Sequence, residues 1–280
     1  MLPSIAMRIP RVLSWLVLLP SLGFGQLRIS KEETPLRLFS GEGRFLQITL
    51  QNAGNQTVQM SLRSQIYQTS SATVLPVGQP QDWKRLEILA HQTVKESIPL
   101  DLPSVMTGTR FLVRVLDERN KAIGTTAVMV YPTNLLQALG RLAGEKPLGL
   151  FDPQDQLKPL LKAAAVEYQE LEEAHLLDFS GKLAIIWTLP AKKESSEFAG
   201  KIGNLAKTGT AVVWIQAFSD DPADLEPAFY PVSVGRGTVT IVSSAVILRI
   251  GEDPRAQLIL VRSAELSLRP DLLALPFSNP

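Results

Sequence analysis

The chain has 280 residues, of which 45% are hydrophobic and 20% are charged, and its formal net charge is +1. This composition excludes an intrinsically disordered chain, and the length is sufficient for two globular domains. Lysine and arginine form no cluster longer than Lys192-Lys193, so the charge pattern of a nucleic-acid-binding protein is missing. The sequence contains no cysteine, which excludes disulfides and a lipid on a lipobox cysteine.

Residues 1–25 predict an export signal. A positively charged start is followed by an apolar stretch over residues 12–19 and by a small-x-small cleavage pattern at residues 23–25. An uncleaved membrane anchor is the alternative, but Pro20 breaks the apolar run, and a span needs roughly 20 residues. We therefore expect a mature chain that starts near Gln26, has no stable membrane span, and is periplasmic or extracellular.

Alternating apolar and polar residues predict strands in the first half of the chain. Leu46, Ile48 and Leu50 share one face of the first clear strand. A turn at residues 52–55 and a second alternating run from Val58 predict that these two strands pair as an antiparallel hairpin. Later segments with strand character are residues 86–89, 94–100, 111–116 and 125–131. Many short strands between turn residues predict an all-β, immunoglobulin-like sandwich over residues 26–132.

Helical spacing replaces this alternation after Tyr131-Pro132. Leucines recur at that spacing before a stop at Gly144, namely Leu135, Leu136, Leu139 and Leu142. Asp152 follows a short apolar strand and is expected to cap a helix whose first position is Pro153. Strands are then predicted at residues 148–151, 167–171, 183–187 and 211–215, and helices at residues 194–206 and 254–268. This alternation implies parallel pairing, so residues 133–280 are expected to form a flavodoxin-like α/β domain with a mostly parallel sheet.

A glycine-flanked turn adds a hairpin to the expected edge of this sheet. Segments 230–234 and 238–242 are joined by Gly235-Arg236-Gly237. The turn lacks the following helix that a phosphate-binding loop requires. We expect the junction between the two domains to lie between Tyr131 and Pro147, where the period changes.

Several motifs carry resemblances to known folds. Residues 89–93 (LAHQT) and 97–100 (SIPL) resemble the loop and strand near the middle of many bacterial immunoglobulin-like domains. Residues 179–186 (FSGKLAII) and 205–213 (LAKTGTAVV) resemble the class I glutamine-amidotransferase-like fold. Residues 234–239 (VGRGTV) and 253–256 (DPRA) are similar to such domains in bacterial β-galactosidase-type glycosidases, including their trimerisation domain. The second resemblance covers roughly residues 147–262 and implies a fold rather than an activity.

The catalytic cysteine that the amidotransferase resemblance implies is missing. It would stand in a tight turn after a central strand, where this chain has residues 214–219 (WIQAFS). Ser219 is the only hydroxyl there, and without flanking glycines it is expected to be a turn residue. Amidotransferase activity is therefore not expected.

The two histidines are also not expected to be functional. His91 falls in a predicted solvated turn. His175 follows Glu172 and Glu173, which suggests a metal site, but adjacent side chains point in different directions and no second histidine is close in sequence.

The remaining acidic candidates have structural explanations. Asp152 and Asp155 stand where open α/β sheets bind ligands, but helix capping and the helix dipole explain both. A third acidic group consists of Asp220, Asp221 and Asp224. This loop suggests a calcium site, but its pattern is equally that of the start of a helix. We therefore assign no catalytic, cofactor-binding or metal-binding residue and expect no cofactor.

The sequence thus favours an exported, non-catalytic binding or assembly protein of the bacterial cell envelope. Its second domain, from about residue 147, is expected to self-associate or to dock to another envelope protein, with no nucleic-acid partner. The alternative is a carbohydrate-active or other hydrolase accessory enzyme. Its carboxylates, such as Asp152 and Asp155 with Glu172 or Glu173, would converge only in the folded chain.

Overall fold

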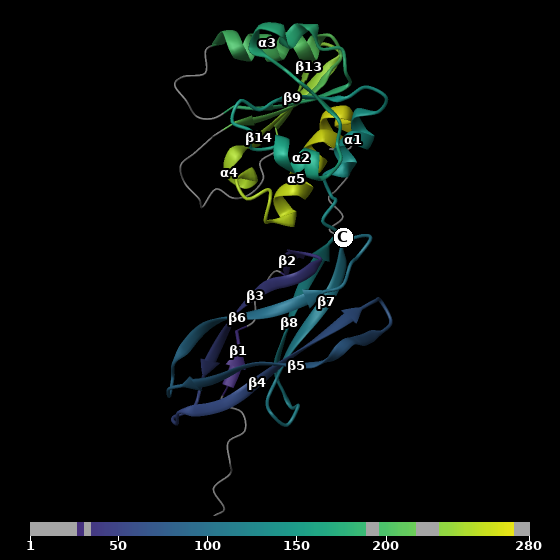
Figure 1. Cartoon of the computed structure of the whole chain (residues 1–280). Coiled ribbons are helices and arrows are strands. Elements are labelled where there is room, and N and C mark those ends of the chain that lie inside the picture. The colour runs from purple at the N-terminus through teal and green to yellow at the C-terminus, as the bar shows by residue number, and fades with distance from the viewer. Residues whose placement is uncertain (1–26, 31–34, 189–195, 217–229, 272–280) are drawn as a thin grey trace, which may run out of the picture.

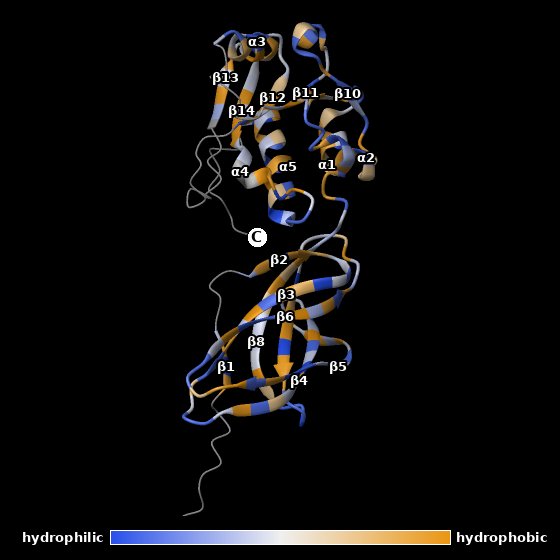
Figure 2. Cartoon of the chain, turned by 60° about the vertical axis from the view of Figure 1, so that its left-hand side comes forward, coloured by the Kyte–Doolittle hydropathy of each residue, from blue (hydrophilic) through white to orange (hydrophobic). Residues whose placement is uncertain are grey.

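The computed structural model describes residues 27–30, 35–188, 196–216 and 230–271. The first half of the chain is built from strands, and the second half combines strands with helices (Figure 1). The two halves follow one another along the long axis of the molecule (Figures 1 and 2). None of the described helices is long and apolar enough to cross a membrane.

The strands of the first half form two sheets around one apolar core. They are β1 (Leu27–Ile29), β2 (Leu36–Phe39), β3 (Gly41–Asn52), β4 (Val58–Thr69), β5 (Val74–Ile88), β6 (Thr93–Leu102), β7 (Thr109–Leu116) and β8 (Ala122–Tyr131). One sheet has the order β1-β3-β6, and the other has the order β2-β8-β7-β4-β5. Both sheets contribute to the core, for example through Leu46, Ile98 and Phe111, which are fully buried.

The predicted hairpin of β3 and β4 is wrong. β3 pairs with β1 and β6, whereas β4 pairs with β5 and β7 in the other sheet. The chain changes sheets directly after Asn52, whose buried amide nitrogen donates to the carbonyl oxygens of Gln56, Ile88 and Leu89 at 2.8, 3.1 and 3.0 Å. This side chain connects the crossing segment to the end of β5 by hydrogen bonds. The alternation of apolar and polar residues does not reveal such a long-range contact.

The described strands of the second half form one sheet, with helices on both faces. Its elements are α1 (Gln137–Ala143), β9 (Leu148–Phe151), α2 (Lys158–Ala163), β10 (Tyr168–Glu170), the 3-10 helix η1 (Glu173–Asp178), β11 (Leu183–Trp187), α3 (Ser196–Lys207), β12 (Ala211–Gln216), β13 (Tyr230–Val234), β14 (Gly237–Ser243), α4 (Ser244–Ile247) and α5 (Pro254–Leu268). The strand order is β10-β9-β11-β12-β14-β13. All pairs are parallel except β13 with β14.

Each face of this sheet has its own apolar core. Ile185 packs in the core shared with α1, α2 and α5, and the neighbouring Ile186 packs in the core shared with α3 and η1. All five residues of β11 are therefore buried, as expected for a central strand covered on both sides. The predicted β11, β12 and α5 are confirmed, and β13 and β14 form the predicted hairpin at the sheet edge.

The predicted fold class is wrong. The structure is a mixed α/β fold with about 47% strand and 23% helix in three sheets, and it is not a clear immunoglobulin-like sandwich followed by a flavodoxin-like domain. In the first half, β2 pairs parallel with β8, and the sequence analysis missed both β1 and β2. In the second half, β14 lies between β12 and the antiparallel edge strand β13. The domain boundaries and the junction between Tyr131 and Pro147 stay predictions.

Candidate functional site

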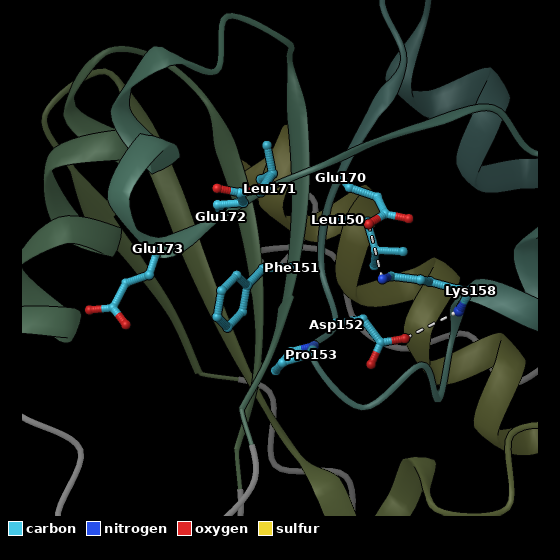
Figure 3. A pocket seen from close by; sticks show the side chains of 9 residues that line it. All are labelled: Leu150, Phe151, Asp152, Pro153, Lys158, Glu170, Leu171, Glu172 and Glu173. Carbon is cyan, nitrogen blue, oxygen red and sulfur yellow. Dashed lines mark hydrogen bonds and ion pairs between the residues drawn. The ribbon is translucent and has the colours of Figure 1, made fainter.

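A pocket of about 300 Å³ lies at the carboxyl ends of β9 and β10 (Figure 3). These strands are parallel neighbours, so their carboxyl ends meet at the same edge of the sheet, where open α/β sheets bind ligands. Its lining residues are Leu150, Phe151, Asp152, Pro153, Lys158, Glu170, Leu171, Glu172 and Glu173. The pocket therefore collects three of the four carboxylates that the enzyme hypothesis names as examples, namely Asp152, Glu172 and Glu173.

Asp152 is the buried acid of this pocket, with 3% of its surface exposed. Its Oδ2 atom accepts hydrogen bonds from the backbone N–H groups of Leu157 at 2.6 Å and Lys158 at 3.2 Å. These donors belong to the start of α2, so Asp152 satisfies groups that a helix leaves unpaired. The other oxygen, Oδ1, is buried and has no hydrogen-bond partner.

The predicted position of this helix is wrong, because α2 begins at Lys158 and not at Pro153. Asp155 has a φ of 54°, which is left-handed backbone and interrupts the helical path. Its N–H closes a turn on the carbonyl oxygen of Asp152 at 3.1 Å. Asp152 therefore reaches across a short loop to the first turn and is not the residue next to the helix.

Lys158 is the cation that organises the mouth of the pocket. Its Nζ atom lies 2.8 Å from Asp155 Oδ1 and 3.1 Å from Glu170 Oε2. Hydrogen bonds to these two carboxylates raise the pKa of Lys158 above its ordinary value. The amine therefore stays protonated at neutral pH and is not available as a general base.

Glu172, Glu173 and His175 form no compact cluster. His175 Nδ1 lies 3.5 Å from Glu172 Oε2, and both side chains are mostly exposed. Glu173 points away from Asp152 and Glu170 (Figure 3), and it pairs with Lys201 Nζ of α3 at 3.0 Å. Within the described ranges, no three histidine, aspartate or glutamate side chains are grouped as a metal site requires.

Other sequence candidates lie away from this pocket. His91 has a φ of 60° and is exposed in the turn between β5 and β6, as predicted. Gly235 has a φ of 62° in the turn between β13 and β14, where a Cβ atom would lie 2.9 Å from Lys207 Cα. Ser219, Asp220, Asp221 and Asp224 lie outside the described residues.

Lys158 and Glu170 were not predicted from the sequence as residues of the site. A signal for both was present, because Lys158 follows Asp155 at helical spacing and Glu170 ends the strand next to β9. Together with Asp155, these residues form a network of one cation and two carboxylates beside the capping Asp152. This arrangement stabilises the loop and the start of α2.

No family model and no curated protein matches this chain. A DNA glycosylase structure from Pseudomonas fluorescens, AlkC bound to DNA containing an abasic site analog, is 16% identical, with a TM-score of 0.29 and coverage of 38% of this chain and 31% of that chain. A β-glucosidase from Listeria innocua in complex with glucose is 14% identical, with a TM-score of 0.29 and coverage of 39% and 16%. This chain thus spans less than a third of the length of either structure, and similarities this low carry no functional argument.

Proposed function

We propose that this chain is an exported, non-catalytic binding or assembly protein of the bacterial cell envelope. The observation that carries the proposal is the role of Asp152 at the ligand-binding edge of the sheet. Its Oδ2 atom accepts hydrogen bonds from two backbone N–H groups, and the nearby Lys158 forms ion pairs with two carboxylates. Asp152 and Lys158 thus stabilise the fold, and we infer that surfaces are the functional feature of the second half. Export rests on the signal pattern of residues 1–25.

Exposed apolar side chains support an assembly role for the second half. Val232 is 49% exposed on the edge strand β13, and Leu248 is 65% exposed directly after α4. An edge strand offers unpaired backbone groups to another chain, and exposed apolar groups favour association. Because the net charge is only +1, apolar burial must drive the contact, and salt should affect it weakly.

A hydrolase is the second candidate, since Asp152, Glu172 and Glu173 line one pocket. Such an enzyme would need one of these carboxylates as a general acid or base. The two candidates differ in what they require of Asp152, which is a capping acceptor in the first and a reacting group in the second.

Light scattering of the full chain at several protein concentrations, at low and high salt, tests the assembly role. We expect concentration-dependent association that Val232→Asp weakens about tenfold or more and that salt hardly changes. Val74→Asp is the matched control, because Val74 is 50% exposed on β5 in the other half. A chain that stays monomeric at all concentrations, or one that both variants weaken equally, would contradict assembly through the second half.

A further inference from the structure

A second pocket, of about 290 Å³, lies between the two halves of the molecule. It is lined by Phe39, Arg44, Thr133, Leu136, Leu160, Ala163, Ala164, Gly251 and Gln257. The first two residues come from the β-rich half, and the others follow Tyr131 in the chain. Helix α5, which carries Gln257, contacts β2, and Figures 1 and 2 both show α5 facing β2 at this junction.

Arg44 brings to this pocket a cation that forms no ion pair with the described residues. It stands at a bulge in β3, where the register shifts between Gly41 and Arg44. Gly41 and Gly43 have φ values of 118° and 63°, which favour glycine, and such bulges redirect side chains. One terminal nitrogen, Nη2, donates to Ser40 O at 3.1 Å, but the buried Nε has no acceptor. None of the described residues that line the pocket is acidic.

Gln257 brings an unpaired acceptor to the same pocket. Its side chain is buried, with 5% of the residue exposed. The Nε2 atom donates to Ile250 O at 2.9 Å, and this bond fixes the orientation of the amide. The Oε1 atom is buried without a hydrogen-bond partner. A buried unpaired donor and a buried unpaired acceptor each cost free energy, and a ligand that satisfies both recovers it.

We propose that the junction pocket binds a small carboxylic acid with a hydrogen-bond donor next to the carboxylate, such as a 2-hydroxy acid. The Arg44 guanidinium takes the carboxylate, because its planar fork matches that group. The Oε1 atom of Gln257 accepts the hydroxyl proton. Leu136 and Leu160 contact the short aliphatic part of the ligand. The volume suits a molecule of a few carbon atoms, and its binding joins the two halves of the chain.

This site is separate from the pocket at Asp152 and does not depend on self-association. The test measures binding of lactate, propionate and lactamide to the full chain by saturation-transfer NMR titration. Propionate lacks the hydroxyl group, and lactamide lacks the negative charge. We expect lactate to bind in the millimolar range and both analogues to bind about tenfold more weakly or less.

Variants of the two polar residues separate their roles. Arg44→Gln should weaken lactate binding about tenfold or more, and Arg44→Lys should restore part of it by returning the charge. Gln257→Leu should abolish the preference for lactate over propionate. Arg37→Gln is the control, since Arg37 is exposed on the neighbouring β2. Circular dichroism confirms that each variant is folded. No lactate binding to the parent chain, equal binding of all three probes, or binding that folded Arg44→Gln leaves unchanged would overturn the proposal.

Discussion

The two halves of this protein bury their sheets in different ways. In β3 of the first half, Leu46 and Ile48 are buried while Gln47 between them is exposed, so only one face meets the core. In β11 of the second half, the neighbours Ile185 and Ile186 are both fully buried in separate cores. A mutation on either face of the second sheet should therefore be costly, whereas the first half should tolerate changes on the outer face of β3.

The largest expected effects come from truncating these strands. Ile185→Ala and Ile186→Ala should each lower the free energy of unfolding by about 2–5 kcal/mol, because each leaves a cavity in a closed core. In the first half, Ile48→Ala should cost a similar amount, while Gln47→Ala should change stability by about 0.5 kcal/mol or less.

Urea denaturation of the full chain measures these differences. Tryptophan fluorescence reports on both halves, through Trp83 in the first and Trp187 and Trp214 in the second, and far-ultraviolet circular dichroism follows the secondary structure. A small loss for either Ile185→Ala or Ile186→Ala would contradict the two-core description of the sheet. An equal loss for Gln47→Ala and Ile48→Ala would contradict the one-sided burial of β3.

A smaller effect is expected where the chain crosses between the sheets of the first half. Asn52→Ala removes three donated hydrogen bonds to backbone oxygens, and it also removes the acceptor for Gly54 N at 3.0 Å. Because these groups are partly or fully buried, we expect the free energy of unfolding, measured by urea denaturation, to fall by about 3 kcal/mol. Asn55→Ala, at an exposed position three residues later, is the matched control and should have little effect. Equal losses in both variants would show that Asn52 does not fix the crossing.

The smallest expected effect concerns the exposed charges at the Asp152 pocket. Hydrogen bonds to Asp155 and Glu170 raise the pKa of Lys158, so its stabilising contribution is complete from neutral pH up to its ordinary value of about 10.5 and is lost only as the pH rises further. The melting temperature of Lys158→Gln should therefore lie slightly below that of the parent chain, by a constant amount, from about pH 7 to about pH 9. The difference should shrink in more alkaline buffer. A difference that already disappears near pH 8 would show that Lys158 does not hold this network.

Local elements were more predictable from the sequence than their arrangement. Gly144 ends α1, and the side chain of Asp253 caps α5 by accepting a hydrogen bond from Arg255 N at 2.8 Å. Both ends were predictable because these residues act on their immediate neighbours in the chain. The pairing of β3 and β4 was predicted wrongly, since Asn52 acts on carbonyl groups 36 and 37 residues away. Most of β5 was missed because Pro76, Gly78 and Pro80 interrupt its pattern, which an edge strand tolerates.

The candidate site was predictable in part. Asp152 was expected to cap the following helix, and it does accept hydrogen bonds from the first turn. Because the backbone at Asp155 is left-handed, α2 begins later in the chain than predicted, at Lys158. The spacing of apolar residues does not reveal such a turn. The link between Lys158 and Glu170 joins two elements that become neighbours only through the parallel pairing of β9 and β10.

Hydrolysis assays on the parent chain and on Asp152→Asn test the central claim most directly. That claim is that Asp152 maintains the fold and is not a reacting group. Asparagine keeps an oxygen that can accept from Leu157 N, so the variant should fold with a slightly lower melting temperature. With nitrophenyl glycosides and an amino-acid nitroanilide as substrates, we predict no turnover above buffer for either protein. Turnover by the parent chain that disappears in a fully folded Asp152→Asn variant would contradict the account and establish the enzyme instead.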